Sequence, residues 1–117
     1  MSIVVFDIGG SAVKFGLWQE DALTGKGSFG TPKTWNAMKA DMKSVFDGFA
    51  AAGSIEGVAI SSPGAVDSDA GIIGGISAVP YIHHFPIKAE WEAMFGNLVS
   101  VENDANCAAL AEVWLGA

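Results

Sequence analysis

The spacing of apolar residues changes near residue 35, and this change limits the folds that the chain can adopt. Before that point, β-branched and aromatic residues run together at 3–6 and again at 13–18, and the glycine-rich turn between the two runs predicts a β-hairpin. From Trp35 to Phe49, apolar residues recur every three or four positions with charged residues between them. This spacing is typical of an amphipathic helix, which we expect to end near Gly53. The chain therefore combines strands with helices.

The remaining residues continue the alternation. Strands are predicted at 58–61 and 98–101, and between them lie a short hairpin (65–67 and 71–73), an irregular loop (76–87) and a helix (87–95, closed by Gly96). A weaker third strand is predicted near 27–30, and a last helix from Asn103 or Asp104 to about Leu115. Strands that alternate with helices predict one α/β domain, and the antiparallel opening hairpin makes its sheet mixed.

Composition excludes several classes of protein. No apolar run approaches the roughly 18–20 residues that a membrane span needs. The first ten residues lack the basic start of a signal peptide, and Asp7 interrupts their apolar stretch. Cys107 is the one cysteine, so neither an internal disulfide nor a cysteine-cluster metal site can form within the chain. We therefore expect a cytoplasmic protein that does not bind membranes.

The charge of the chain argues against nucleic-acid binding. The net charge is −7, and the six basic residues are all lysines that are scattered along the sequence. Nucleic-acid binding relies on basic patches that neutralise phosphates, and no such patch is visible. If the chain binds a nucleotide, backbone amides or a divalent metal must balance the phosphate charge in place of arginine.

The first motif with possible chemistry is Asp7-Ile8-Gly9-Gly10-Ser11, followed by Lys14. Two glycines allow positive φ angles and a close approach of the backbone to a ligand, and amides in such a turn can hold phosphate oxygens. Asp7 could hold a divalent metal directly or through water, and Lys14 could help to balance phosphate charge. The alternative is a plain hairpin turn with a solvent-facing aspartate. The long glycine loop of a Walker motif is absent.

The second motif is Glu102-Asn103-Asp104-Ala105-Asn106-Cys107, at a predicted junction of strand and helix. Ligands of α/β sheets gather at the carboxyl ends of strands. Asn103 can donate and accept hydrogen bonds, as a polyol ligand requires, and Asp104 could accept a proton from a hydroxyl that attacks phosphorus. The alternative is that either residue only caps the helix.

The third motif is Ser61-Ser62-Pro63-Gly64, with Gly74-Gly75 after it. It could form one wall of a substrate cleft, with the hydroxyl of Ser62 and the backbone of Gly75 available to a sugar. The alternative is a strand, a turn and a hairpin without a ligand. Other conspicuous residues have structural interpretations. We expect exposed loop positions for His83 and His84, a core position for Cys107, and packing roles for Trp18, Trp35, Trp91 and Trp114, with Trp91 also a candidate to line the cleft.

Together the three motifs resemble the ROK family (repressors, unassigned frames and sugar kinases). The resemblance covers residues 3–117 and rests on FDIGGSAVKFGL, GVAISSPGAVDSDAGIIGG and VENDANCAALAEVWLGA, in family order and at family spacing. It implies a ribonuclease-H-like lobe of the actin-like ATPase fold, with a mixed β-sheet and flanking helices. It also implies ATP-dependent transfer of a phosphoryl group to a hydroxyl of a hexose or hexosamine, with Mg²⁺ as the metal.

The resemblance assigns roles to individual residues. Asp7, Gly9, Gly10 and Ser11 match the first phosphate motif of the family, in which threonine is commoner than the serine found here. On the sugar side, Asn103 matches a sugar-binding position, Asp104 matches the catalytic base, and Gly75 lies in the segment that approaches the sugar.

Family kinases continue into a second lobe, which carries the adenosine pocket, a second glycine-rich motif, a Glu-x-Gly-His segment and often a structural zinc site. The resemblance therefore implies that residues 1–117 are the N-terminal lobe of a sugar kinase and that the lobe alone is inactive. We expect a homodimer or a larger assembly, because half of a kinase would expose apolar surface. Two alternatives remain, a sugar-sensing transcriptional regulator of the same family and a non-catalytic actin-like binding module. The sequence leaves the sugar open.

Overall fold

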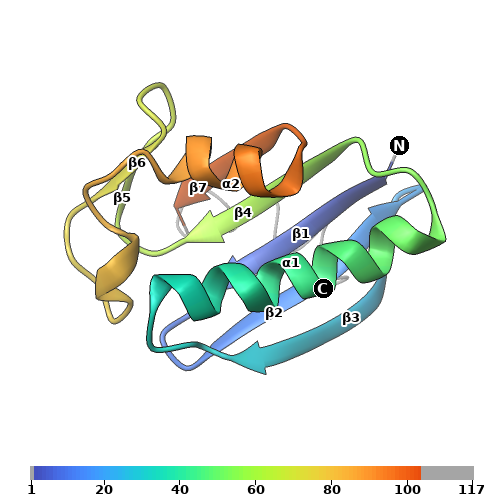
Figure 1. Ribbon diagram of the computed structural model, residues 1–117, viewed down its shortest axis with the longest axis horizontal. Helices are drawn as coiled ribbons and strands as arrows, with labels where there is room; N and C mark the ends of the chain where they lie inside the picture. Colours follow the sequence, from blue (N-terminus) through green and yellow to red (C-terminus); the bar gives the residue numbers. More distant parts are fainter. Residues whose placement is uncertain (1, 104–117) are drawn as a thin grey trace.

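A five-stranded mixed sheet forms the centre of the protein (Figure 1). The computed structural model describes residues 2–103 of the chain. The strands of this sheet are β1 (Ser2–Ile8), β2 (Ala12–Gln19), β3 (Ala22–Gly30), β4 (Gly57–Ser62) and β7 (Val99–Asn103), in the spatial order β3-β2-β1-β4-β7. β2 is antiparallel to both of its neighbours, β1 and β3, whereas β4 runs parallel to β1 and β7 runs parallel to β4. The predicted α/β class with a mixed sheet is confirmed.

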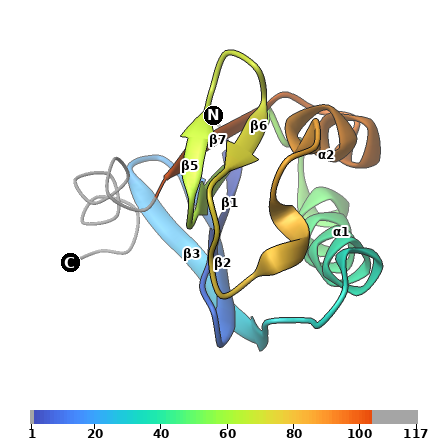
Figure 2. The same cartoon turned by 90° about the vertical axis from the view of Figure 1, so that its left-hand side faces the viewer.

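Two helices, α1 (Trp35–Ala52) and α2 (Ile87–Phe95), cover the same face of this sheet (Figure 2). The hydroxyl of Thr34 caps α1 by accepting a hydrogen bond of 3.2 Å from the amide of Ala37. Gly53 follows the last residue of α1, as predicted. Gly96 ends α2 in the left-handed conformation, with φ 62°, and its amide donates to the carbonyl of Glu92.

The hydrophobic core lies between the sheet and these helices. Alternate residues of the central strands point towards the helices, because successive side chains of a strand face opposite sides. Each such side chain contributes about 1.5–3 kcal/mol when it is fully buried. The buried core includes Val4, Phe6 and Ile8 of β1, Val58 and Ile60 of β4, Val99 and Val101 of β7, Met38, Met42 and Phe46 of α1, and Ile87, Trp91 and Phe95 of α2. Trp91 is therefore a core residue and does not line a cleft.

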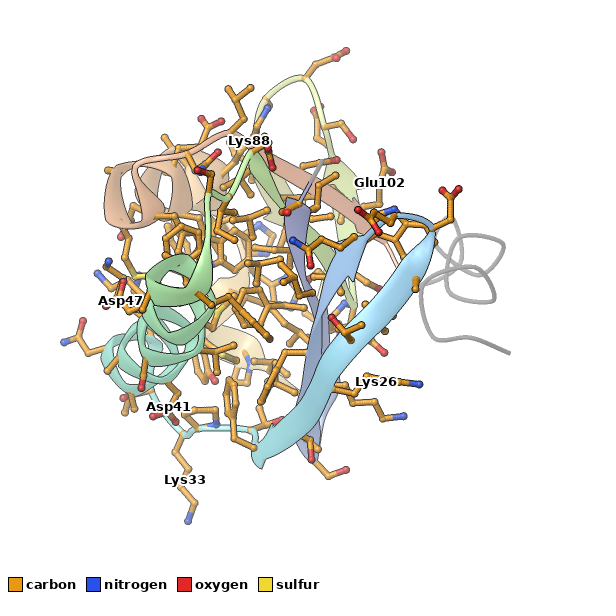
Figure 3. The ribbon with its side chains drawn as sticks, turned by 90° about the vertical axis from the view of Figure 1, so that its right-hand side faces the viewer. Lys26, Lys33, Asp41, Asp47, Lys88 and Glu102 are labelled. Atoms are coloured by element: carbon orange, nitrogen blue, oxygen red, sulfur yellow. The ribbon has the colours of Figure 1, made fainter. Side chains whose placement is uncertain are left out.

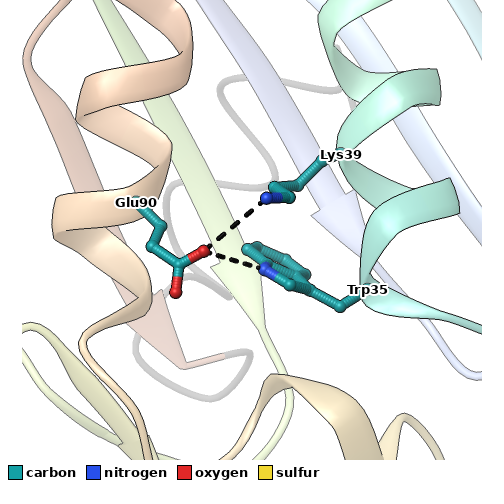
Figure 4. Close-up of polar contacts among 3 residues, drawn as sticks. All are labelled: Trp35, Lys39 and Glu90. Atoms are coloured by element: carbon teal, nitrogen blue, oxygen red, sulfur yellow. Dashed lines mark hydrogen bonds and ion pairs between the residues drawn. The ribbon is translucent and has the colours of Figure 1, made fainter.

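One polar cluster ties the two helices together at the surface of the core (Figure 4). The indole nitrogen of Trp35 donates to Oε1 of Glu90 at 3.1 Å, and Nζ of Lys39 lies 3.7 Å from the same oxygen. The ammonium group of Lys39 also lies 5.6 Å from the centre of the Trp35 ring. Partly exposed charge pairs contribute little to stability by themselves. We therefore infer that this cluster mainly fixes how α1 and α2 lie relative to each other.

A two-stranded sheet of β5 (Ala65–Asp67) and β6 (Ile72–Gly74) lies beyond the carboxyl end of β4 (Figure 1). A short 3-10 turn, η1 (Pro80–Ile82), follows it within the segment that the sequence predicts as an irregular loop. The charged side chains are dispersed, and Lys26, Lys33 and Lys88 project from different parts of the surface (Figure 3). Within residues 2–103 the structure has no helix that is long and apolar enough to cross a membrane.

The prediction for the third strand is wrong in extent. The sequence places it near 27–30, whereas β3 runs from Ala22 to Gly30. Residues 22–26 carry no alternating apolar pattern, and they join the sheet through backbone pairing with β2, as in the pair Trp18 and Leu23. An edge strand can form in this way because its partner supplies the hydrogen bonds. The predicted last helix, with Asp104, Cys107 and Trp114, lies outside the described residues.

Candidate functional site

The three parallel strands bring their carboxyl ends to one edge of the sheet. In the register of the sheet, Asp7 of β1 lies opposite Ser61 of β4, and Ser61 lies opposite Glu102 of β7. The turn that follows β1 and the turn that follows β4 are therefore neighbours. Ligands of open α/β sheets bind at such an edge, so the first and third sequence motifs meet where a ligand is expected.

A row of polar side chains crosses the sheet on the face away from the helices. Its members share one level because they are register partners on adjacent strands, and they alternate with core residues along each strand. Lys14 is exposed, Asp7 and Glu102 are half-buried, and Ser61 is buried. Figure 3 shows Glu102 on the side of the sheet opposite to α1. We call Lys14, Asp7, Ser61 and Glu102 the polar row.

The glycine turn, residues 9–11, is held by hydrogen bonds to its own backbone and to Thr31. The amide of Gly9 donates to the carbonyl of Ala12 at 3.0 Å, and the hydroxyl of Thr31 donates to the carbonyl of Gly9 at 2.7 Å. The amide of Thr31 donates to the carbonyl of Ser11 at 3.1 Å. Gly10 and Ser11 are exposed at the tip. The turn is therefore fixed from behind and open towards solvent.

The glycines of this turn are required for a different reason from the one that the sequence suggests. Neither Gly9 nor Gly10 lies in the region of φ that favours glycine, so the positive φ angles that the sequence allows are not found here. A Cβ atom on Gly9 would lie 3.0 Å from the carbonyl oxygen of Ala12, and one on Gly10 would lie 3.1 Å from Cβ of Ala78. The small size of glycine, rather than its conformational freedom, allows this packing.

The third motif forms a tight turn against the small hairpin. Ser62 is 0% exposed, and its hydroxyl donates to the carbonyl of Pro63 at 3.1 Å. Gly64 has φ +96°, and a Cβ atom there would lie 2.7 Å from Cε1 of His83 and 2.9 Å from the carbonyl oxygen of Gly74. Gly75 has φ +77° and is exposed beside Ala65. The structure therefore brings Gly75 to the edge of the site and directs the Ser62 hydroxyl to the backbone.

The segment after Gly75 folds back onto the glycine turn. Ile76 is 91% exposed, whereas Val79 and Ile82 are buried in the core and anchor the segment. The phenol of Tyr81 donates to the carbonyl of Pro32 at 2.5 Å, and burial raises the pKa of this phenol. In this segment Ala78 lies beside Gly10 of the glycine turn.

The prediction of two exposed histidines is wrong for His83. Its side chain is half-buried, with Nε2 lying 2.8 Å from the hydroxyl oxygen of Ser77 and Nδ1 lying 3.4 Å from the carbonyl oxygen of Ile73. His84 is exposed, as predicted. Sequence reasoning missed Thr31, Ser77 and His83 as residues that shape this edge, because each acts through a partner that is distant in sequence or lies in an irregular loop.

Only the first two residues of the second motif, Glu102 and Asn103, lie within the part of the chain that the structure describes. Asn103 is the last residue of β7 and lies opposite Ser62 in the register, so the chain leaves β7 at the same edge as the other two motifs. Asp104 follows it outside the described residues. Since parallel strands β4 and β7 end together, the backbone placement of Asn103 agrees with a role at this edge.

The oxygen donors at this edge of the sheet suit a partly hydrated Mg²⁺. Among residues 2–103, no group of three or more histidine, cysteine, aspartate or glutamate side chains could hold a metal by itself. Mg²⁺ commonly keeps several waters and binds through one or two carboxylates together with substrate phosphates. Asp7, half-buried beside the open glycine turn, fits that pattern.

A small cavity lies elsewhere, away from the strand edge. It measures about 70 Å³ and lies between β2 and the end of α1, where Leu17, Phe49 and Ile55 contribute to its lining. This volume is far below the roughly 300–1,000 Å³ of a typical pocket for a small-molecule ligand.

Comparison with known proteins identifies close relatives. The model of the ROK family matches residues 3–117. The chain is 39% identical over 118 residues to the beta-glucoside kinase of Klebsiella pneumoniae, covering 99% of this chain and 39% of that protein. It is 33% identical over 112 residues to the N-acetyl-D-glucosamine kinase of Vibrio cholerae, covering 93% of this chain and 37% of that protein. The chain thus spans about two fifths of the length of these relatives.

The fold agrees with a solved structure of the same kind. A ROK family glucokinase from Streptomyces griseus, in complex with glucose and AMPPNP, superimposes with a TM-score of 0.85 at 28% identity. The superposition covers 100% of this chain and 38% of that one. The actin-like ATPase fold that the sequence predicts is therefore confirmed.

Proposed function

Because this chain belongs to the ROK family, we propose that the protein containing it transfers the γ-phosphoryl group of ATP to a hydroxyl group of a hexose or hexosamine. The observation that carries the proposal is the meeting of Asp7, the glycine turn and the segment after Gly75 at one strand edge, in a chain whose relatives include a beta-glucoside kinase and an N-acetyl-D-glucosamine kinase. Residues 1–117 would form the first lobe of this kinase, and we infer that the lobe alone is inactive.

On the phosphate side, the glycine turn presents an open backbone to the nucleotide. Thr31 donates hydrogen bonds to the carbonyls of Gly9 and Ser11, which keep the turn in its shape. The exposed tip of the turn would then contact phosphate oxygens. Asp7 would hold Mg²⁺, which would neutralise phosphate charge in a chain that lacks arginine. Lys14, the exposed register partner of Asp7, would add one positive charge.

On the sugar side, Gly75 and Asn103 would bind hydroxyl groups of the substrate, and Ser62 would support them by shaping the turn after β4. Asp104 would accept the proton of the attacking hydroxyl. The oxygen of that hydroxyl forms a bond to the γ-phosphorus, and the bond between this phosphorus and its bridging oxygen breaks to release ADP. Positioning and charge neutralisation account for most of the catalysis in such reactions.

Several finer features of the proposal concern the whole protein. The relatives act on β-glucosides and on N-acetyl-D-glucosamine, so both classes are candidate substrates. We also propose a cytoplasmic location and assembly into a homodimer or larger. A structural zinc site would belong to the second lobe of the kinase.

The proposal can be tested with the protein expressed from its entire coding frame. ADP formation is measured with glucose, N-acetylglucosamine, N-acetylmannosamine, fructose, allose and β-glucosides as acceptors, with and without Mg²⁺. We expect Mg²⁺-dependent activity on at least one of them. In the Asp104→Asn variant we expect a loss of about 10²–10⁴-fold in kcat, because the general base is removed while the shape of the side chain is kept.

Asp69→Asn is a suitable control, because it removes an exposed carboxylate of the small hairpin and should leave kcat unchanged. Sugar binding without ADP formation would contradict the kinase proposal and favour a sugar-sensing regulator. Neither binding nor turnover with any acceptor would favour a non-catalytic binding module.

A further inference from the structure

The side chain of His83 joins three segments at the edge of the candidate site. Its Nε2 lies 2.8 Å from the hydroxyl oxygen of Ser77, and its Nδ1 lies 3.4 Å from the carbonyl oxygen of Ile73 at the end of the small hairpin. Its Cε1 lies against Gly64, where a Cβ atom would approach it to 2.7 Å. The loop after β6, the small hairpin and the turn after β4 therefore share one imidazole ring.

The two ring nitrogens contact different partners. The carbonyl oxygen of Ile73 can only accept, so a hydrogen bond at Nδ1 requires the hydrogen there, and Nε2 then accepts from the Ser77 hydroxyl, whose oxygen also lies 3.4 Å from the carbonyl oxygen of Val79. The hydroxyl oxygen of Ser77 accepts in turn from the amide of Val79 at 3.1 Å. A continuous chain of hydrogen bonds thus runs from the backbone of residue 79 through Ser77 and His83 to β6.

This chain of hydrogen bonds fixes the segment between the proposed sugar and phosphate sides. Gly75, the proposed sugar contact, lies two residues before Ser77, and Ala78 packs directly against Gly10 of the glycine turn. The glycine turn has its own supports in Ala12 and Thr31, which do not involve His83. His83 therefore acts on the sugar side of the contact and leaves the phosphate side in place.

We propose that His83, through Ser77, is a positioning residue that holds residues 75–78 in the conformation that binds the sugar. The proposal rests on the proposed kinase function. Without the hydrogen bond, residues 76–78 keep the anchor at Val79 and the contact of Ala78 with Gly10, but they lose the side-chain link to the small hairpin. The expected consequence is weaker sugar binding with nucleotide binding unchanged.

The test compares variants of the full-length enzyme. His83→Phe keeps a flat ring and removes both hydrogen bonds, and Ser77→Ala removes the other partner. Each should raise the KM for the sugar about tenfold, the effect of one net hydrogen bond, and change the KM for ATP less than about twofold. His83→Gln, whose amide oxygen can accept from Ser77, should restore the sugar KM to within about threefold of the wild-type value.

His84→Asn serves as the matched control. His84 is exposed and has φ 67°, a conformation that asparagine tolerates, so this variant should keep both KM values. The effect of the double variant Ser77→Ala with His83→Phe should be smaller than the sum of the two single effects, since both variants remove the hydrogen bond between these side chains. Nitrogen NMR of the imidazole should also show the Nδ1–H tautomer of His83 in the wild-type protein.

The outcomes separate this inference from the proposed function. An active wild-type kinase whose His83→Phe and Ser77→Ala variants keep the sugar KM would overturn the role of His83 alone. Equal increases in the KM values for sugar and ATP, or additive effects in the double variant, would also overturn it. A full-length protein without any sugar kinase activity would overturn the proposed function, and the sugar-binding role of His83 with it. If His83→Phe does not fold, Ser77→Ala, on a half-buried loop residue, decides the matter.

Discussion

Replacing Gly64 with alanine should destabilise the protein strongly, although the change adds one methyl group. Gly64 has φ +96°, a conformation that costs an L-residue about 1–2 kcal/mol. The new Cβ atom would also lie 2.7 Å from Cε1 of His83, 2.9 Å from the carbonyl oxygen of Gly74 and 3.0 Å from Cγ2 of Ile73. Crowding of this kind costs about 1–3 kcal/mol, so the total loss should be about 2–5 kcal/mol.

Gly48→Ala is the matched control, because the same chemical change should have the opposite sign there. Gly48 lies in α1, is exposed, and has nothing within 4 Å of the position that a Cβ atom would take. Alanine should stabilise the helix by about 0.5–1 kcal/mol, since glycine loses more conformational entropy on folding.

Thermal unfolding of the full-length protein without ligands measures both effects. At about 2–4 °C per kcal/mol for a domain of moderate size, Gly64→Ala should lower the Tm by roughly 10 °C and Gly48→Ala should raise it by a few degrees. A Gly64→Ala variant as stable as the wild type would refute the argument. It would mean that the turn after β4 can adopt another conformation, and that the contact between Gly64 and His83 does not constrain it.

Two further variants probe the glycine turn and the segment after β6. Thr31→Val removes the hydroxyl that donates to the carbonyl of Gly9 at 2.7 Å, so the KM for ATP should rise about fivefold to tenfold while the KM for the sugar is kept. An unchanged KM for ATP in steady-state kinetics would show that the turn does not need this hydrogen bond. Burial raises the pKa of Tyr81 in the folded state, so the contribution of this phenol to stability is present below pH 10 and is lost as the pH rises through the folded pKa. The Tm measured from pH 8 to 11 should therefore fall less steeply in Tyr81→Phe than in the wild type. Parallel curves for the two proteins would contradict this.

Sequence reasoning predicted the elements whose residues repeat with a clear period. The apolar spacing from Trp35 to Phe49 and the glycine after it were sufficient for α1, and Gly96 was sufficient for the end of α2. The start of β3 could not be predicted in this way. Residues 22–26 become a strand because β2 offers them hydrogen bonds, and that information lies in the partner rather than in their own composition.

The part of the candidate site that lies at the end of a strand could be predicted from the sequence. Asp7 ends a buried run and precedes two glycines, and the register places it beside Ser61 at the edge that the sequence predicts. Ser77 and His83 could not be recognised as site residues, since they belong to an irregular segment and are linked only by a hydrogen bond that the structure shows. Thr31 is distant in sequence from the turn that it supports.

The glycines of the site show a distinction that no sequence pattern reveals. Gly64 and Gly75 have positive φ angles, whereas Gly9 and Gly10 are confined only by neighbouring atoms. At Gly10 the neighbour is the methyl group of Ala78, which belongs to the segment that His83 holds. The small size of Gly10 therefore allows the proposed phosphate turn and the proposed sugar segment to touch. A Cβ atom at Gly10 would require Ala78 to move by a few tenths of an ångström, so a residue larger than glycine at this contact would push the two loops apart.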